Sequence, residues 1–185
     1  MKIRDICFTA LFASVIAVCS QISIPAGVPF TLQTFAVPLA GIVLGARKGF
    51  IAVAVYILIG AAGVPVFTQF KSGFAVLFGH TGGYIISFPF MAFLAGIGAD
   101  LYAGAAHKNR FIRYIILGGS LVLGSAVTYA IGMTVGKFYM GFDNWGQAFA
   151  VFVAPFIYSE VIKIVLACGI GLNVKSILAK SRILV

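Results

Sequence analysis

Charged residues are scarce in this sequence of 185 residues, and acidic residues are the scarcest. Only 9% of the residues are charged, and four are Asp or Glu, whereas an ordinary soluble domain carries about 25% charged residues. By contrast, 62% of the residues are apolar and the mean hydropathy is +1.12. This composition excludes a soluble globular protein, an intrinsically disordered chain and a coiled coil.

Cysteines and catalytic motifs are also few or missing. Cys7, Cys19 and Cys168 each lie in an apolar run without a CxxC pair, so we interpret them as small packing residues rather than as zinc ligands or a disulfide framework. The sequence contains no HExxH, GxSxG or GxxxxGK[ST] motif. We therefore predict no catalytic residue, no metal site and no cofactor. Because no nucleotide-binding motif is present, any energy for pumping must come from elsewhere.

Long apolar stretches predict the fold. About 20 residues of helix cross a bilayer, and this chain divides into six apolar stretches at charged, proline-containing or glycine-rich breaks. We predict an all-α membrane protein, a compact bundle of six transmembrane helices that forms one transmembrane domain over residues 1–185. The predicted spans cover approximately residues 6–24, 30–46, 49–64, 81–101, 112–136 and 147–172.

The basic residues predict the orientation of the bundle. The formal net charge is +9, and with a cytoplasmic N-terminus ten Lys and Arg residues fall on the inner side. These ten are Lys2, Arg4, Arg47, Lys48, Lys108, Arg110, Arg113, Lys175, Lys180 and Arg182. Only Lys71 and Lys137 fall on the outer side. The positive-inside rule then predicts cytoplasmic N- and C-termini and a long outer loop between spans three and four. The excess charge therefore indicates membrane lipid, not nucleic acid, as its partner.

Two charged residues lie deep in the sixth predicted span. Glu160 and Lys163 are three residues apart, so one face of a helix carries both. Each costs about 2.5–3.5 kcal/mol at the centre of a bilayer on insertion scales, and pairing seldom makes two charges better than two leucines. One interpretation is an ion pair that fixes the register of the helix. The other, which we favour, is a polar anchor inside a protein-lined cavity.

The segment between the third and fourth spans, residues 63–84, is too apolar for a solvated loop and too rich in glycine for a helix. We predict a re-entrant or lid-like loop that packs on the spans. Glycines such as Gly73 allow close approach of the backbone to a ligand, and Tyr84 offers an apolar wall. Lys71 is a candidate partner for an anionic ligand, and the alternative is a solvated lysine at the interface.

Two further features have two interpretations each. Gln33 opens the second span and needs a hydrogen-bond partner, which is either another helix or a ligand. In the first span Ala10, Ala13, Ser14 and Ala17 form a smooth face of small residues. This face serves either internal packing of the bundle or docking to another membrane protein.

Five segments match, in order, the motifs of one known family. They are Pro29–Thr34 (P-x-T-L-Q), Leu44–Gly49 (LG-x-R-x-G), Tyr56–Phe67 (Y…G…G-x-PVF), Phe78–Tyr84 (G-P-T-G-G-Y) and Pro155–Lys163 (P…D-x-x-K). Over nearly its whole length the chain thus resembles the BioY family, the biotin-specific substrate-binding (S) components of energy-coupling-factor (ECF) transporters. The order of the motifs, rather than any single one, makes the resemblance specific.

The resemblance implies high-affinity capture and transport of biotin at the bacterial cytoplasmic (inner) membrane by a multi-pass protein that does not hydrolyse ATP. It implies an ECF transmembrane coupling protein and two cytoplasmic ATPase subunits as partners, with Ala13 and Ala17 facing the coupling protein. Together with the residues singled out above, it gives one predicted biotin site. The site consists of Glu160, Lys163, Lys71, Gln33, Gly73 and Tyr84. Which charged group meets which end of biotin stays open.

The chain departs from the family pattern at four positions. His80 stands where proline is usual, and Glu160 where aspartate is usual. Ile85 stands where some members carry an arginine that helps bind biotin, and Lys71 stands where such members carry a polar ligand-binding residue. We expect Glu160 to keep the anchor's charge and Lys71 to compensate for the missing arginine.

Two other functions remain compatible with the sequence. One is an S component for another small vitamin, and the other is a non-catalytic membrane assembly subunit that binds no small ligand. A membrane enzyme acting on lipid is disfavoured because the sequence shows no nucleophile–base pair.

Overall fold

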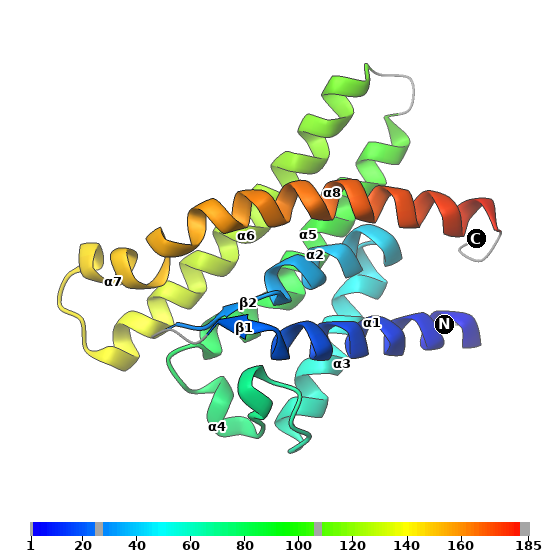
Figure 1. The fold of residues 1–185 in the computed structure, drawn as a ribbon. Helices are drawn as coiled ribbons and strands as arrows, with labels where there is room; N and C mark the ends of the chain where they lie inside the picture. Colours follow the sequence, from blue (N-terminus) through cyan, green and yellow to red (C-terminus); the bar gives the residue numbers. More distant parts are fainter. Residues whose placement is uncertain (1, 25–27, 106–108, 182–185) are drawn as a thin grey trace.

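A computed structural model describes residues 2–24, 28–105 and 109–181, and most of them are helical (Figure 1). Residues 25–27 of the first predicted break lie outside this part of the chain, as do Lys108 and Arg182 from the charge count. The elements, in chain order, are α1 (Ile3–Gln21), β1 (Ser23–Ile24), β2 (Phe30–Thr31), α2 (Gln33–Leu44), α3 (Ala46–Ala61), η1 (Thr68–Phe70), α4 (Phe74–Leu77), α5 (Gly82–Gly104), α6 (Arg110–Met140), α7 (Trp145–Phe152), η2 (Ala154–Phe156) and α8 (Ile157–Lys180).

Four segments of the described chain are helical, long and apolar enough to cross a membrane. They are Ile3–Gln21, Gly82–Gly104, Arg110–Met140 and Trp145–Lys180. The helices in the second and third predicted spans are shorter, with 12 residues in α2 and 16 in α3. At 1.5 Å per residue these measure about 18 and 24 Å, less than the ~30 Å core of a bilayer. The protein is therefore a helical membrane protein in which α2 and α3 are shorter than the bilayer core.

Two local details go beyond the predicted stretches. The sixth stretch, 147–172, lies within the apolar helical segment Trp145–Lys180, in which α7 ends at Phe152 and α8 begins at Ile157. Pro155 lies in the intervening turn η2, and proline has no N–H with which to continue the helical hydrogen bonds. The glycine-rich connection between α3 and α5 contains one helical turn, α4, which is flanked by Gly73 and Gly79.

Helix α5 is the centre of the packing and contacts α2, α3 and α6, while α8 packs on α2 (Figure 1). The N-terminal end of α1 and the C-terminal end of α8 lie on the same side of the molecule, and α4 and α7 lie toward the opposite end. A short antiparallel pair joins α1 to α2, with Ser23 opposite Thr31. This hairpin and the α3–α5 connection place irregular backbone beside the same helix ends, where a site can form.

Two glycines let the central helices approach closely. A Cβ added at Gly41 would lie 2.0 Å from the Ala92 carbonyl oxygen, and one added at Gly96 would lie 2.3 Å from the Ala46 backbone nitrogen. Both obstacles are backbone atoms, so a larger residue would push α5 away from α2 or from the start of α3. Glycine at these positions is therefore a requirement of packing rather than of flexibility.

We expect Gly41→Ala and Gly96→Ala each to destabilise the protein by about 3 kcal/mol, since overpacking a close helix contact forces the backbone to shift. The measurement is the thermal unfolding midpoint in detergent. Gly118→Ala is the matched control, because nothing lies within 4 Å of a Cβ added there. Equal midpoints for Gly41→Ala and Gly118→Ala would contradict the close approach of α2 and α5.

Candidate ligand pocket

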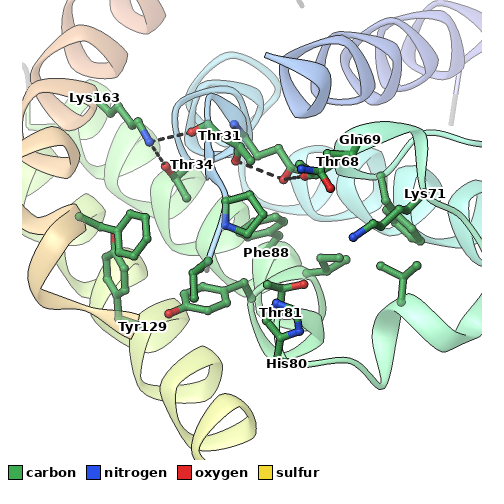
Figure 2. Close-up of a pocket in the computed structure, with 18 residues that line it drawn as sticks. Thr31, Thr34, Thr68, Gln69, Lys71, His80, Thr81, Phe88, Tyr129 and Lys163 are labelled. Atoms are coloured by element: carbon green, nitrogen blue, oxygen red, sulfur yellow. Dashed lines mark hydrogen bonds between the residues drawn. The ribbon is translucent and has the colours of Figure 1, made fainter. Parts of the chain in front are cut away.

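A pocket opens between the β1–β2 hairpin and the start of α2, the α3–α5 connection, the N-terminal parts of α5 and α8, and Tyr129 of α6 (Figure 2). It holds about 780 Å³ of empty space, its open mouth included. Its lining consists of Val28, Pro29, Thr31, Gln33, Thr34, Phe67, Thr68, Gln69, Lys71, Val76, His80, Thr81, Tyr84, Ile85, Phe88, Tyr129, Phe156 and Lys163. Among the described residues, the lining contains two lysines and no Asp or Glu, so its charge suits an anionic ligand.

Lys163 reaches the pocket from α8 and is only 7% exposed. Its Nζ donates to the Thr31 carbonyl oxygen at 2.7 Å and to Thr34 Oγ1 at 2.8 Å, and lies 4.4 Å from the centre of the Phe30 ring. These groups come from β2 and the first turn of α2, so the lysine ties α8 to the hairpin (Figure 2). The ammonium is thus held in place by neutral groups, and a ligand carboxylate or carbonyl could approach it without displacing an ion pair.

Glu160 lies one turn before Lys163 but does not line the pocket. Its carboxylate accepts hydrogen bonds from the Ser125 hydroxyl at 2.8 Å and from the Tyr129 hydroxyl at 3.3 Å, and the residue is 5% exposed. Glu160 and Lys163 form no salt bridge with each other; the bridges in the described part of the chain join other residues. The two charges share one side of the helix but point to different neighbours, and Tyr129 connects Glu160 to the pocket wall.

Gln33, the first residue of α2, is buried and lines the pocket. Its Nε2 donates to the Tyr56 hydroxyl at 2.6 Å, while its Oε1 accepts from Thr31 and Thr68 hydroxyls, each at 3.3 Å. The side chain therefore has protein partners on three elements. It joins the hairpin, α3 and the α3–α5 connection at one point.

The α3–α5 connection forms the outer wall of the pocket. Phe67 is 1% exposed and anchors the connection against α3, where its ring meets the Tyr56 ring edge-on with 5.6 Å between centres. Lys71 is exposed and points back toward the pocket (Figure 2). Gly73 is not among the lining residues. Its N–H donates to the Gly60 carbonyl oxygen at 2.8 Å, and with a φ of 88° it precedes the first residue of α4.

A clamp from the end of α1 holds the same wall. Gln21 Nε2 donates to the Phe67 carbonyl oxygen at 3.0 Å, and Gln21 Oε1 accepts from the Phe70 N–H at 3.0 Å. Gln69 and Phe70, in this same stretch, have positive φ values of 60° and 57° respectively. This backbone conformation costs a non-glycine residue about 1–2 kcal/mol. Because Gln69 lines the pocket, Gln21 shapes the wall without touching the cavity.

Aromatic residues form the wall opposite the loop. The Tyr84 hydroxyl donates to the Phe152 carbonyl oxygen at 2.6 Å, and its ring meets the Tyr129 ring edge-on with 6.0 Å between centres. Phe156 stacks on Phe30 at 5.9 Å. These rings offer an apolar surface to a ligand.

Sequence patterns indicated some of these residues and missed others. Of the six predicted site residues, Gln33, Lys71, Tyr84 and Lys163 line the pocket, Glu160 bonds to the lining residue Tyr129, and Gly73 lies outside the lining, where it bonds to Gly60. His80 and Ile85, two of the departures from the family pattern, also line it. Among the lining residues that the sequence did not single out are Thr34, Thr68, Gln69, Phe88 and Tyr129. Isolated hydroxyl groups in apolar runs were the available signal, but such groups also bond to their own helix.

The small-residue face of α1 lines a different hollow, of about 500 Å³. Its lining consists of Ala10, Ala13, Ser14, Ala17, Val55, Tyr56, Ile59 and Val66. Ala13 is 5% exposed, whereas Ala10 and Ser14 are exposed. Both interpretations of this face therefore keep support, because part of it packs inside the protein and part is open.

The fold and the pocket together define a class: a multi-pass helical membrane protein with a basic, aromatic-walled cavity for a small molecule. The family model described as the BioY family matches residues 1–180. The chain belongs to the BioY family.

Individual relatives agree with this assignment. The biotin transporter BioY of Thermotoga maritima is 41% identical over 94% of this chain and 97% of its own length. Biotin transporter BioY2 of Lactococcus lactis is 39% identical over 92% of this chain and 90% of its own length. A crystal structure of the S-component for biotin from an ECF-type ABC transporter superposes with a TM-score of 0.82 and 26% identity, covering 95% of this chain and 92% of that chain.

Proposed function

We propose that the chain captures biotin and serves as the substrate-binding subunit of an ECF-type transporter. The single observation that carries the proposal is the pocket lined by Lys163, Lys71 and Gln33 with no acidic residue, in a chain of the BioY family. The relatives named above as biotin transporters, and the structural neighbour named as an S-component for biotin, support the same function. The protein itself is non-catalytic in this proposal.

The chemistry of biotin suits this pocket. Biotin has an anionic carboxylate, a ureido group with two N–H donors and one carbonyl acceptor, and an apolar sulfur-containing ring. Lys163 and Lys71 offer cations, Gln33 and the threonine hydroxyls offer donors and acceptors, and Tyr84 and its aromatic neighbours offer apolar surface. In this proposal Glu160 acts through Tyr129, and Gly73 acts as part of the loop. The ligand is largely enclosed and a few polar contacts fix its orientation.

The membrane arrangement that we propose has six spans in one domain, in the cytoplasmic membrane of a bacterium, with both termini in the cytoplasm. The ends of α1 and α8 on one side of the molecule support it (Figure 1), as does the excess of basic residues on that side. The pocket and the α3–α5 connection then face outward. The open part of the Ala13 and Ala17 face supports docking of a transmembrane coupling protein, which works with two cytoplasmic ATPase subunits.

Isothermal titration calorimetry of the detergent-purified protein with biotin tests the proposal. We expect saturable binding of one biotin per chain, and competition with thiamine, riboflavin and lipoate separates biotin capture from capture of another vitamin. Tight binding of one of these competitors with no binding of biotin would move the chain to another substrate. No binding of any of them would indicate an assembly subunit instead.

The clamp at the end of α1 gives a kinetic prediction. We expect Gln21→Met to release biotin about tenfold faster, because two hydrogen bonds of about 1 kcal/mol each no longer hold the outer wall closed. The measurement is dissociation of labelled biotin after dilution. Thr134→Val is the control, since it removes a side-chain hydrogen bond to Ala130 on α6, away from the wall. An unchanged release rate for Gln21→Met would show that the wall does not limit release.

A further inference from the structure

Two arginines and two tyrosines form a cluster where α5 ends and α6 begins. We call Tyr102, Arg110, Arg113 and Tyr114 the arginine–tyrosine cluster. The Arg113 Cζ lies 4.1 Å from the centre of the Tyr102 ring, and the Arg110 Cζ lies 5.8 Å from that of Tyr114. The two rings meet edge-on with 5.5 Å between their centres. The four side chains therefore form one contiguous surface, on the pair of helices that projects from the rest of the molecule (Figure 1).

The positive charge of the cluster is not neutralised within the described part of the chain. Neither arginine takes part in a salt bridge there, since the two bridges join Lys48 to Asp5 and Lys175 to Asp100. Asp100 is the single acidic residue of α5, and its carboxylate accepts from Lys175 at 3.1 Å; α6 has no acidic residue. Stacking on an aromatic ring orients a guanidinium but leaves its charge in place.

The orientation of Arg113 is fixed by a second contact. Its Nε donates to the Tyr102 carbonyl oxygen at 3.1 Å while its Cζ lies over the Tyr102 ring. Because Nε is already used, an arginine held in this way presents the N–H groups of its two terminal nitrogens to an acceptor. Phosphate oxygens match that fork, because they accept two parallel N–H bonds from one guanidinium.

The length of α6 gives the depth of the cluster. The helix has 31 residues, which at 1.5 Å per residue is about 46 Å, whereas the hydrocarbon core of a bilayer is ~30 Å thick. The helix is therefore longer than the core is thick, and because charged residues are costly in the core, the end that carries Arg110 and Arg113 is placed at the level of the lipid headgroups. Phe111, Ile115 and Leu101 beside the cluster are 71%, 55% and 55% exposed, so apolar surface lies next to the two positive charges.

We propose that the arginine–tyrosine cluster binds the phosphate of an anionic phospholipid. The guanidinium groups of Arg110 and Arg113 hold the phosphate, the tyrosine hydroxyls add donors, and an acyl chain lies along Phe111 and Ile115. This assignment is separate from the ligand pocket and does not rest on the identity of the transported molecule. The proposal is that one lipid molecule binds at the cluster, which is more specific than a general attraction of basic residues to a negatively charged membrane surface.

Native mass spectrometry of the detergent-purified full chain tests the proposal with phosphatidylglycerol and phosphatidylcholine of the same acyl chains. We expect the parent protein to retain phosphatidylglycerol with about tenfold preference, and Arg110→Gln/Arg113→Gln to lose that preference. Lys175→Gln/Lys180→Gln is the matched control, because it removes two positive charges from α8 and leaves the cluster intact. Biotin binding and thermal unfolding of both double variants report whether each is folded.

Three results would overturn the proposal. A parent protein without preference for phosphatidylglycerol would mean that the cluster does not select anionic lipid. Equal losses in the two double variants would mean that total charge, and not the cluster, attracts the lipid. Displacement of bound phosphatidylglycerol by inorganic phosphate at equal concentration would make free phosphate the ligand, since a lipid held also by its acyl chain resists that exchange. Tyr102→Leu keeps both positive charges but removes the ring under Arg113. We expect this variant to retain less phosphatidylglycerol than the parent.

Discussion

Lys163→Met is expected to weaken biotin binding about 100-fold or more, equivalent to about 2.7 kcal/mol. The substitution keeps a chain of similar length but removes the buried cation that bonds to Thr31 and Thr34 and lies over Phe30. It removes both a partner for the ligand and the link between α8 and the hairpin. Titration calorimetry with biotin measures the loss.

Lys175→Met is the control for this prediction. Lys175 is on the same helix as Lys163, near the C-terminal end of α8. Its ammonium bonds to Asp100 of α5, away from the pocket. An exposed ion pair of this kind contributes little to stability. Biotin binding should therefore stay within about twofold of the parent in Lys175→Met. Parent-like affinity in Lys163→Met would remove Lys163 from the site.

Biotin methyl ester extends the test to the orientation of the ligand. If Lys163 meets the carboxylate, the parent binds the ester weakly and Lys163→Met loses no further affinity for it. If Lys163 meets the ureido carbonyl instead, the substitution weakens binding of biotin and of the ester to the same extent. Either outcome decides which end of biotin meets the buried lysine.

Glu160→Ala is expected to weaken biotin binding by about 30-fold, through Tyr129 rather than by loss of a direct contact. The substitution leaves the Ser125 and Tyr129 hydroxyls without their carboxylate acceptor in a buried place, and an unsatisfied buried group costs about 1–3 kcal/mol. Tyr129 lines the pocket and can then move. Calorimetry measures the loss of biotin affinity, and a thermal unfolding curve measures the loss of stability.

A double-mutant cycle distinguishes this indirect role from a direct one. If Glu160 acts through Tyr129, the Glu160→Ala/Tyr129→Phe protein binds biotin about as weakly as Glu160→Ala alone. Additive losses from the two substitutions would show that Glu160 contributes independently of Tyr129. Glu160→Gln is the conservative variant, and because it keeps a hydrogen-bonding side chain it should restore most of the affinity.

The helices were predictable because long apolar runs and charged breaks have a direct physical meaning in a membrane. The break inside the sixth stretch was less visible, because Val153, Ala154 and Phe156 are as apolar as the helices on either side. Only Pro155 marked the end of helical hydrogen bonding there. The β1–β2 pairing of two residues per strand is too short to produce any alternation that a sequence pattern could reveal.

The candidate site was predictable only in part, for a reason that Glu160 and Lys163 illustrate. A spacing of three residues gives a common helical face, but it does not say which neighbour each side chain reaches. Lys163 turns to Thr31 and Thr34, which are more than a hundred positions away in the chain, and Glu160 turns to Ser125 on α6. Gln21 gave no signal of its own, because its partners belong to the α3–α5 connection. Such tertiary contacts follow from the packing and not from the local pattern.

The most direct test of the account is an experimental structure of the protein with biotin bound. We expect biotin in the cavity between the α3–α5 connection and the aromatic wall, with a polar atom of biotin within hydrogen-bond distance of Lys163 Nζ and its ring against Tyr84. Biotin bound in the hollow beside Ala13 and Ala17, or in the cavity with no contact to Lys163, would contradict it.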